Sequence, residues 1–157
     1  MAAITVTPDQ DAIVCEIEIA APPERVFEAL TDPRQVRAMN VKDSHEITVW
    51  GMDLRVGGIW RSTVREKATG REYVHHGEVV EIKPPYLLAH TWFANFHDQP
   101  ARPTLVRYEL KAIPTGTRLK VTHSGLAPEP KAREAYRGGW PGVLAAIKNF
   151  VEKQERK

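Results

Sequence analysis

One amphipathic segment near the C-terminal end of the sequence constrains the fold most, because its apolar face needs another surface to cover. It follows a linker at residues 125–130 that contains Gly and Pro. Apolar residues recur at spacings of three and four at Trp140, Val143, Leu144, Ile147 and Val151, with Lys148, Glu152 and Glu155 on the opposite side. This spacing predicts a long helix that packs through one face against the rest of the chain.

The preceding sequence supplies a sheet for that helix to cover. Residues 13–19 alternate, with apolar Ile13, Cys15, Ile17 and Ile19 on one face and Glu16 and Glu18 on the other. Helical spacing over residues 22–30, and again around Val36 and Met39, predicts two short helices. Strands are then expected over residues 47–50, 59–64, 72–82, 87–93, 105–110 and 119–123. This order predicts one α+β domain over residues 1–157, with its core at about 12–155.

Turn signals separate the expected strands. Gly57-Gly58 favours a bend or bulge before the second of them, since glycine accepts backbone angles that side chains forbid. Hairpins or turns are expected at residues 68–70, 83–85 and 114–116, which contain Gly or Pro. The strands therefore follow one another through short connections.

Composition argues against several classes of function. The net charge is +2 and is spread along the chain, so no nucleic-acid partner is expected. Apolar residues never run for the ~18 positions that a membrane span needs, and the first residues do not resemble a signal peptide. A cytoplasmic protein without a membrane span is expected. Cys15 is the one cysteine, which predicts a small core residue and no intramolecular disulfide.

Several short motifs in a fixed order carry a family resemblance. The longest are residues 17–33 (IEIAAPPERVFEALTDP) and 53–60 (DLRVGGIW). Shorter ones are residues 77–82, 84–85, 91–92, 116–119, 123–126 and 139–140. Together they resemble the START-like superfamily, also called SRPBCC or birch-pollen-allergen-like. Within it, the chain is similar to the branch of the C-terminal domain of the activator of the heat-shock protein 90 ATPase.

The resemblance implies a helix-grip fold, in which a curved antiparallel sheet wraps around the C-terminal helix and leaves a cavity between them. It also implies a stress-associated or accessory protein that binds an apolar or aromatic small molecule, lipid-like or polycyclic, without catalysis. On strand and helix alternation, the predicted ligand contacts are Trp60, Leu88, His90, Trp92, Tyr108, His123, Trp140 and Leu144. The alternative is that these side chains only fill the core.

A metal or other cofactor is not expected. Neighbouring His75 and His76 point to opposite faces of a strand, and the sequence has no second cysteine and no His-Glu-x-x-His motif. A pocket enzyme of the cyclase or hydrolase type is an alternative, because relatives of this fold include such enzymes. It would use acid-base chemistry by His90, His123, Tyr108 or Glu81, although no nucleophile or phosphate-loop motif is present.

A chaperone-linked protein-interaction module is a third hypothesis, which the family resemblance suggests. The eukaryotic activator has an additional N-terminal domain for which the residues before Ile13 leave no room, so chaperone contact is not expected. Phe96, in a polar loop at residues 94–103, is interpreted either as a lid on the pocket or as a contact with a second subunit in a homodimer. Gly138-Gly139 is expected just before the long helix, as a simple bend at its start or, alternatively, as a hinge that controls access to the pocket.

Overall fold

The computed structural model describes residues 2–156. Within these residues the strands are β1 (Ala3–Val6), β2 (Ile13–Ile19), β3 (His45–Met52), β4 (Ile59–Glu66), β5 (Glu72–Lys83), β6 (Leu87–Ala94), β7 (Thr104–Ile113) and β8 (Gly116–Ser124). The helices are α1 (Pro23–Thr31), α2 (Pro33–Met39) and α3 (Pro130–Glu155). β1 was not among the expected strands, because four residues at a sheet edge are too short for a clear alternation.

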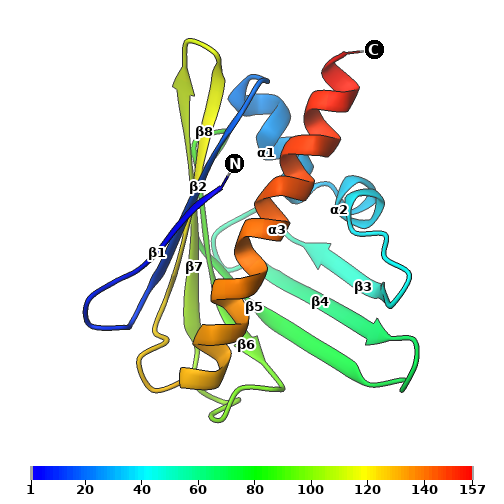
Figure 1. Cartoon of the computed structure of the whole chain (residues 1–157), viewed down its shortest axis with the longest axis vertical. Coiled ribbons are helices and arrows are strands. Elements are labelled where there is room, and N and C mark those ends of the chain that lie inside the picture. The colour runs from blue at the N-terminus through cyan, green and yellow to red at the C-terminus, as the bar shows by residue number, and fades with distance from the viewer. Residues whose placement is uncertain (1, 157) are drawn as a thin grey trace.

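The strands form one curved antiparallel sheet in the order β1-β2-β8-β7-β6-β5-β4-β3. All three helices lie on the same side of the sheet, and α3 runs across it (Figure 1). The predicted α+β helix-grip fold is therefore confirmed.

One completely covered part of the core lies between β2 and the C-terminal half of α3. Ile13, Cys15, Ile17 and Ile19 of β2 are all buried, as their alternation predicts. Two polar contacts fix the helix above this strand. The Lys148 ammonium donates to the carbonyl oxygen of Glu18 at 2.9 Å, and the Glu152 carboxylate accepts from the Ala20 backbone N–H at 2.8 Å. α3 therefore has a defined position over β2.

The two short helices follow β2 for local reasons. Pro23 lies in the first turn of α1, where its missing N–H costs no helical hydrogen bond. Asp32 ends α1 and caps α2, since its carboxylate accepts from the Arg34 backbone N–H at 3.1 Å. α2 then packs against β3 and also contacts α3. It occupies the space between the long helix and the far edge of the sheet (Figure 1).

α3 begins earlier than the sequence pattern indicated. It starts at Pro130, so Gly138 and Gly139 lie inside the helix rather than before it, and Pro141 also lies inside. The prediction that Gly138-Gly139 precedes the helix and bends the chain at its start was wrong. Ala132 is buried and Tyr136 packs against the core, so the apolar stripe continues towards the N-terminus of α3. This packing outweighs the helix cost of the glycines, about 1 kcal/mol each.

Two irregularities change which strand residues face α3. The pairing shifts register between Ile47 and Val49 in β3, and between Val79 and Glu81 in β5. Each shift is a β-bulge, in which one strand carries an extra residue relative to its partner. As a result Val49 is exposed, and after the β5 bulge Ile82, rather than Glu81, packs against the core. In β3, the residues after the bulge include Trp50 and Met52, which face the helices.

The bend expected at Gly57-Gly58 is present just before β4. Gly57 has a φ of +86°, a backbone conformation that favours glycine. A Cβ atom on Gly58 would lie 2.1 Å from the carbonyl oxygen of Asp53. Both glycines are therefore needed for the tight connection that leads into β4.

Candidate functional site

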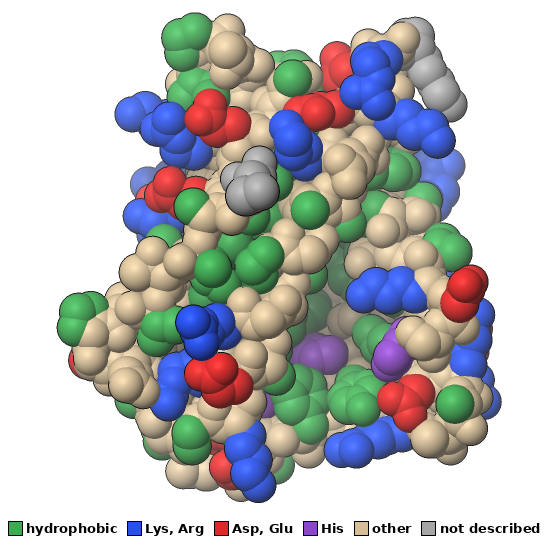
Figure 2. All heavy atoms as spheres, viewed as in Figure 1, with side chains coloured by type: hydrophobic (Ala, Val, Ile, Leu, Met, Phe, Trp, Pro, Cys, Tyr) green, Lys and Arg blue, Asp and Glu red, His purple; other side chains and the backbone are tan. Residues whose placement is uncertain are grey.

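A pocket of about 260 Å³ lies between α3 and the part of the sheet formed by β3 to β7. Figure 2 shows it as a hollow beside α3, with hydrophobic and histidine side chains on its floor. The lining residues are Ala29, Leu30, Val36, Met39, Asn40, Ile47, Trp50, Met52, Trp60, Ser62, Val64, His75, His90, Trp92, Tyr108, Tyr136, Gly139, Trp140, Val143 and Ile147. We call this the inner pocket.

The inner pocket is aromatic and uncharged. Its lining includes the tryptophans Trp50, Trp60, Trp92 and Trp140, and none of the described lining residues is Asp, Glu, Lys or Arg. The ring centroids of Trp60 and Trp92 are 4.9 Å apart, and those of Trp92 and Trp140 are 5.9 Å apart. These separations are typical of favourable aromatic pairs. The three rings therefore form a continuous apolar wall.

Trp60 is held in place by a hydrogen bond to the backbone, and Gly77, which has no side chain, leaves the space for it. Its indole Nε1–H donates to the Thr91 carbonyl oxygen at 2.8 Å. Gly77 pairs with Trp60 on the neighbouring strand, and a Cβ atom there would lie 1.9 Å from that oxygen and 2.6 Å from the indole nitrogen. Glycine at this position therefore lets the indole approach the backbone of β6.

Trp140 is oriented by a buried histidine. Its Nε1–H donates to Nδ1 of His123 at 3.2 Å, so Nδ1 carries no proton. The proton of the neutral ring is then on Nε2, which donates to the Thr104 hydroxyl at 2.8 Å, and that hydroxyl donates to the Trp92 carbonyl oxygen at 2.9 Å. Burial holds the pKa of His123 well below its usual range. His123 thus supports the pocket wall as a neutral residue.

A second polar network includes the lining residues Trp92 and Tyr136, the latter in the N-terminal part of α3. The Trp92 Nε1–H donates to the Tyr136 hydroxyl at 2.9 Å, and Nε2 of His97 lies 2.7 Å from the same oxygen. The ring of Phe96 lies 5.6 Å from that of His75 and 5.9 Å from that of Tyr136. Phe96 therefore packs against two rings of its own chain that line the pocket.

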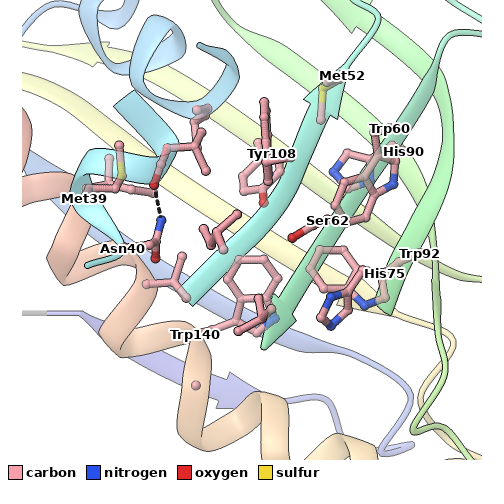
Figure 3. A pocket seen from close by; sticks show the side chains of 18 of the residues that line it. Met39, Asn40, Met52, Trp60, Ser62, His75, His90, Trp92, Tyr108 and Trp140 are labelled. Atoms are coloured by element: carbon pink, nitrogen blue, oxygen red, sulfur yellow. Dashed lines mark hydrogen bonds between the residues drawn. The ribbon is translucent and has the colours of Figure 1, made fainter. Parts of the chain in front are cut away.

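A few neutral polar groups face the inner pocket. The hydroxyl groups of Ser62 and Tyr108 point towards its centre (Figure 3). Nδ1 of His90 lies 3.1 Å from the Thr91 carbonyl oxygen, which can only accept, so Nδ1 carries the proton and Nε2 a lone pair. Burial lowers the pKa of both His75 and His90 to about 4. These histidines are therefore uncharged near neutral pH.

Five of the residues predicted to contact a ligand line the inner pocket: Trp60, His90, Trp92, Tyr108 and Trp140. The other three, Leu88, His123 and Leu144, are fully buried in the core and are not among the lining residues. Strand alternation places Leu88 and His123 on the inward side of the sheet, and helical spacing places Leu144 on the inward side of α3. There all three meet other side chains instead of the pocket. Glu81, a candidate acid-base residue, forms an ion pair with Arg107 at 2.6 Å on the outer side of the sheet.

Some lining residues were not predicted. The β3 bulge hides the inward positions of Trp50 and Met52 from a simple alternation pattern. Tyr136 lies four positions before Trp140 on the same side of α3, so extending the helical stripe would have identified it. The turn after α2 brings Asn40 to the pocket, which no periodic signal indicates.

The histidines do not gather into a metal site in the part of the chain that the structure describes, since no three His, Cys, Asp or Glu side chains there are grouped suitably. His75 lines the pocket, whereas exposed His76 stacks on Phe93 with ring centroids 4.8 Å apart. The prediction that these two neighbours face opposite ways is confirmed.

Within residues 2–156, none of the helices has the length and apolar character that a membrane-spanning helix needs.

Comparison with known proteins agrees with this architecture. The fold is similar to that of a protein from Rhodobacter sphaeroides, with 21% sequence identity, a TM-score of 0.79, and coverage of 99% of this chain and 98% of that one. A protein from Chromobacterium violaceum has 24% identity and a TM-score of 0.78, over 90% of this chain and 98% of that one. The AHSA1-like protein from Aeromonas hydrophila has 22% identity and a TM-score of 0.75, over 93% of this chain and 95% of that one.

No curated protein matches the sequence significantly. The family described as Activator of Hsp90 ATPase homolog 1-like protein matches residues 20–152, which is most of the chain. Its fold is that of the START/SRPBCC superfamily, which commonly binds hydrophobic ligands. The chain therefore belongs to the Activator of Hsp90 ATPase homolog 1-like family.

Proposed function

We propose that this protein binds a compact aromatic molecule in the inner pocket and does not transform it. The observation that carries the proposal is a pocket lined by four tryptophans without a charged side chain among its described residues. Pockets for small molecules are mostly apolar, with a few polar groups that orient the ligand. Ser62, His90 and Tyr108 supply such groups here.

The volume favours a ring system over a long acyl chain. An apolar cavity of about 150 Å³ accommodates benzene. The inner pocket, at about 260 Å³, has room for roughly two or three fused or linked rings on that scale. Of the lipid-like and polycyclic classes expected from the sequence, the polycyclic class is therefore supported better.

The protonation states support binding rather than acid-base catalysis. A general base works best when its pKa is close to the working pH, whereas the pKa of His90 is lowered to about 4. Burial raises the pKa of Tyr108, which keeps its hydroxyl protonated. Both ring nitrogens of His123 already have hydrogen-bond partners. His90 and Tyr108 are thus suited to accept or donate a fixed hydrogen bond from or to a bound molecule.

A matched pair of variants tests the proposal. Gly139 lines the inner pocket and neighbouring Gly138 does not, and a Cβ atom at either position would have no atom within 4 Å. Gly139→Leu should project a side chain into the pocket, whereas Gly138→Leu should extend into solvent. Binding of N-phenyl-1-naphthylamine, an uncharged fluorescent probe with three aromatic rings, should weaken about tenfold or more in the first variant only.

Native mass spectrometry of the purified protein would show whether a compound remains bound, and extraction would identify it. If the wild-type protein bound neither the probe nor any copurified compound, binding in the inner pocket would be refuted. Equal probe affinity in the two leucine variants would also refute it. Turnover of an extracted compound would favour the enzyme alternative.

A further inference from the structure

A second, outer pocket of about 210 Å³ adjoins the inner one. It is lined by Arg37, Asn40, Val41, Lys42, His45, Glu46, Ile47 and Lys67. Asn40 and Ile47 line both pockets, so these two residues form the boundary between them. The two pockets are therefore direct neighbours, and a ligand that occupied both would pass these two side chains.

Three cations of the outer pocket come from two separate segments. Arg37 lies in the last turn of α2 and Lys42 follows that helix, while Lys67 begins the turn after β4. A backbone hydrogen bond of 2.9 Å, from the Lys67 N–H to the Ser44 carbonyl oxygen, joins these segments. The fold thus gathers the three cations around the outer pocket. Figure 2 shows Lys and Arg side chains near the hollow beside α3.

These cations have no anionic partner of their own. Within the described residues, Arg37, Lys42 and Lys67 take part in no ion pair. The one acidic residue in the described lining, Glu46, is already paired with Arg65 at 3.1 Å. Nε2 of the lining residue His45 lies 3.6 Å from Oε2 of Glu66, which is not a lining residue. The outer pocket therefore has an excess of positive charge directly beside an uncharged pocket.

We propose that the outer pocket is an anion subsite and that the natural ligand is an aromatic compound bearing an acidic group, such as a carboxylate, sulfonate or phosphate. The rings occupy the inner pocket and the acidic group lies among Arg37, Lys42 and Lys67. This inference rests on the proposed function, because it assigns the second half of the same ligand. Such a ligand would use both the uncharged inner pocket and the positively charged outer pocket, whereas a wholly apolar ligand would use only the inner one.

Two probes that differ by one acidic group test the inference. N-phenyl-1-naphthylamine is uncharged, and 1-anilinonaphthalene-8-sulfonate adds a sulfonate to the same rings. The sulfonate probe should bind about tenfold more tightly at low ionic strength, and about 0.5 M salt should remove most of that gain because the cations are exposed. The uncharged probe should show little dependence on salt.

A charge-matched pair of triple variants locates the effect. Arg37→Gln/Lys42→Gln/Lys67→Gln should remove the preference for the sulfonate probe and leave the affinity for the uncharged probe unchanged. Lys83→Gln/Lys111→Gln/Lys131→Gln, which removes three exposed cations that line neither pocket, should retain the preference. Loss of the preference in both variants would overturn the inference, since net charge alone would then explain it.

The outcomes separate this inference from the proposed function. If both probes bind equally well, the anion subsite is refuted and the aromatic pocket stands. If neither probe binds, the proposed function is refuted and the inference fails with it.

Discussion

The two halves of the sheet have the same alternating sequence pattern but different surroundings. On the β2 and β8 side, inward residues such as Ile13, Leu119 and Val121 are completely buried. On the β3 and β4 side, inward residues such as Ile47 and Val64 are only partly buried and line the inner pocket. Alternation therefore determines which way a side chain points, and the position of α3 determines whether it meets core or cavity.

The position of α3 has identifiable causes. Lys148 and Glu152 hold its C-terminal half to the backbone at the end of β2. On the other side, α2 packs on β3 and also contacts α3, so it separates the long helix from the far edge of the sheet. The cavity thus results from a helix that is fixed over one half of the sheet and held away from the other.

The largest expected effect compares one substitution in the two halves. Ile19→Ala should lower the free energy of unfolding by about 2–5 kcal/mol, because it leaves a hole in a closely packed core. Ile47→Ala should cost less than about 1.5 kcal/mol, since its side chain is partly exposed and already borders a cavity. Urea unfolding of both variants measures the difference. Equal losses would contradict the distinction between a filled and an open half.

The pocket histidines should make stability depend on pH. The pKa values of His75 and His90 are lowered from 6.5 to about 4, so between these values the unfolded chain binds protons that the folded chain does not. The free energy of unfolding should therefore fall as pH decreases through this window, by about 1.4 kcal/mol per pH unit for each histidine. Urea unfolding at several pH values between about 7.5 and 4.5 measures this slope.

A pair of histidine variants assigns that slope to the pocket. His90→Gln should reduce it by about 1.4 kcal/mol per pH unit, because one buried histidine no longer titrates on unfolding. His76→Gln serves as the control, since His76 is exposed, and it should leave the slope unchanged. An unchanged slope in the His90 variant would show that this ring is not buried as described.

The smallest expected effect is that of Gly142→Ala, and Gly77→Ala provides the contrast of opposite sign. Gly142→Ala in α3 should raise the free energy of unfolding by about 0.5–1 kcal/mol, because alanine favours the helix and its Cβ meets no atom within 4 Å. Gly77→Ala should lower stability instead, because its Cβ would overlap the Thr91 carbonyl group. Thermal unfolding of both variants gives the two signs. Destabilisation by Gly142→Ala would indicate a hidden requirement for flexibility in α3.

Much of the fold could be predicted because its strongest signals are local. The alternation of Ile13, Cys15 and Ile17 identified β2, and the stripe through Trp140 and Ile147 identified the C-terminal part of α3. The helix start was missed because two glycines looked like a break, although tertiary packing keeps them helical. β1 was missed because pairing with β2, rather than its own pattern, defines it.

The site could be predicted only in part. Alternation correctly placed Trp60 and Trp92 on the inward side, but it could not distinguish them from Leu88, which is inward and buried by neighbours. The β3 bulge moved Trp50 to the pocket without a visible sequence signal. The contacts of the natural ligand stay a prediction. Which inward residues face open space depends on the long-range position of α3.

Gly139 has a kinetic consequence. It lines the inner pocket while remaining exposed, so the helix presents no side chain at that point between the pocket and the solvent. Entry of a ligand past Gly139 would require neither displacement of α3 nor opening of the sheet. Association should approach the ordinary diffusion-controlled range, and differences in affinity among ligands should arise mainly from their residence times.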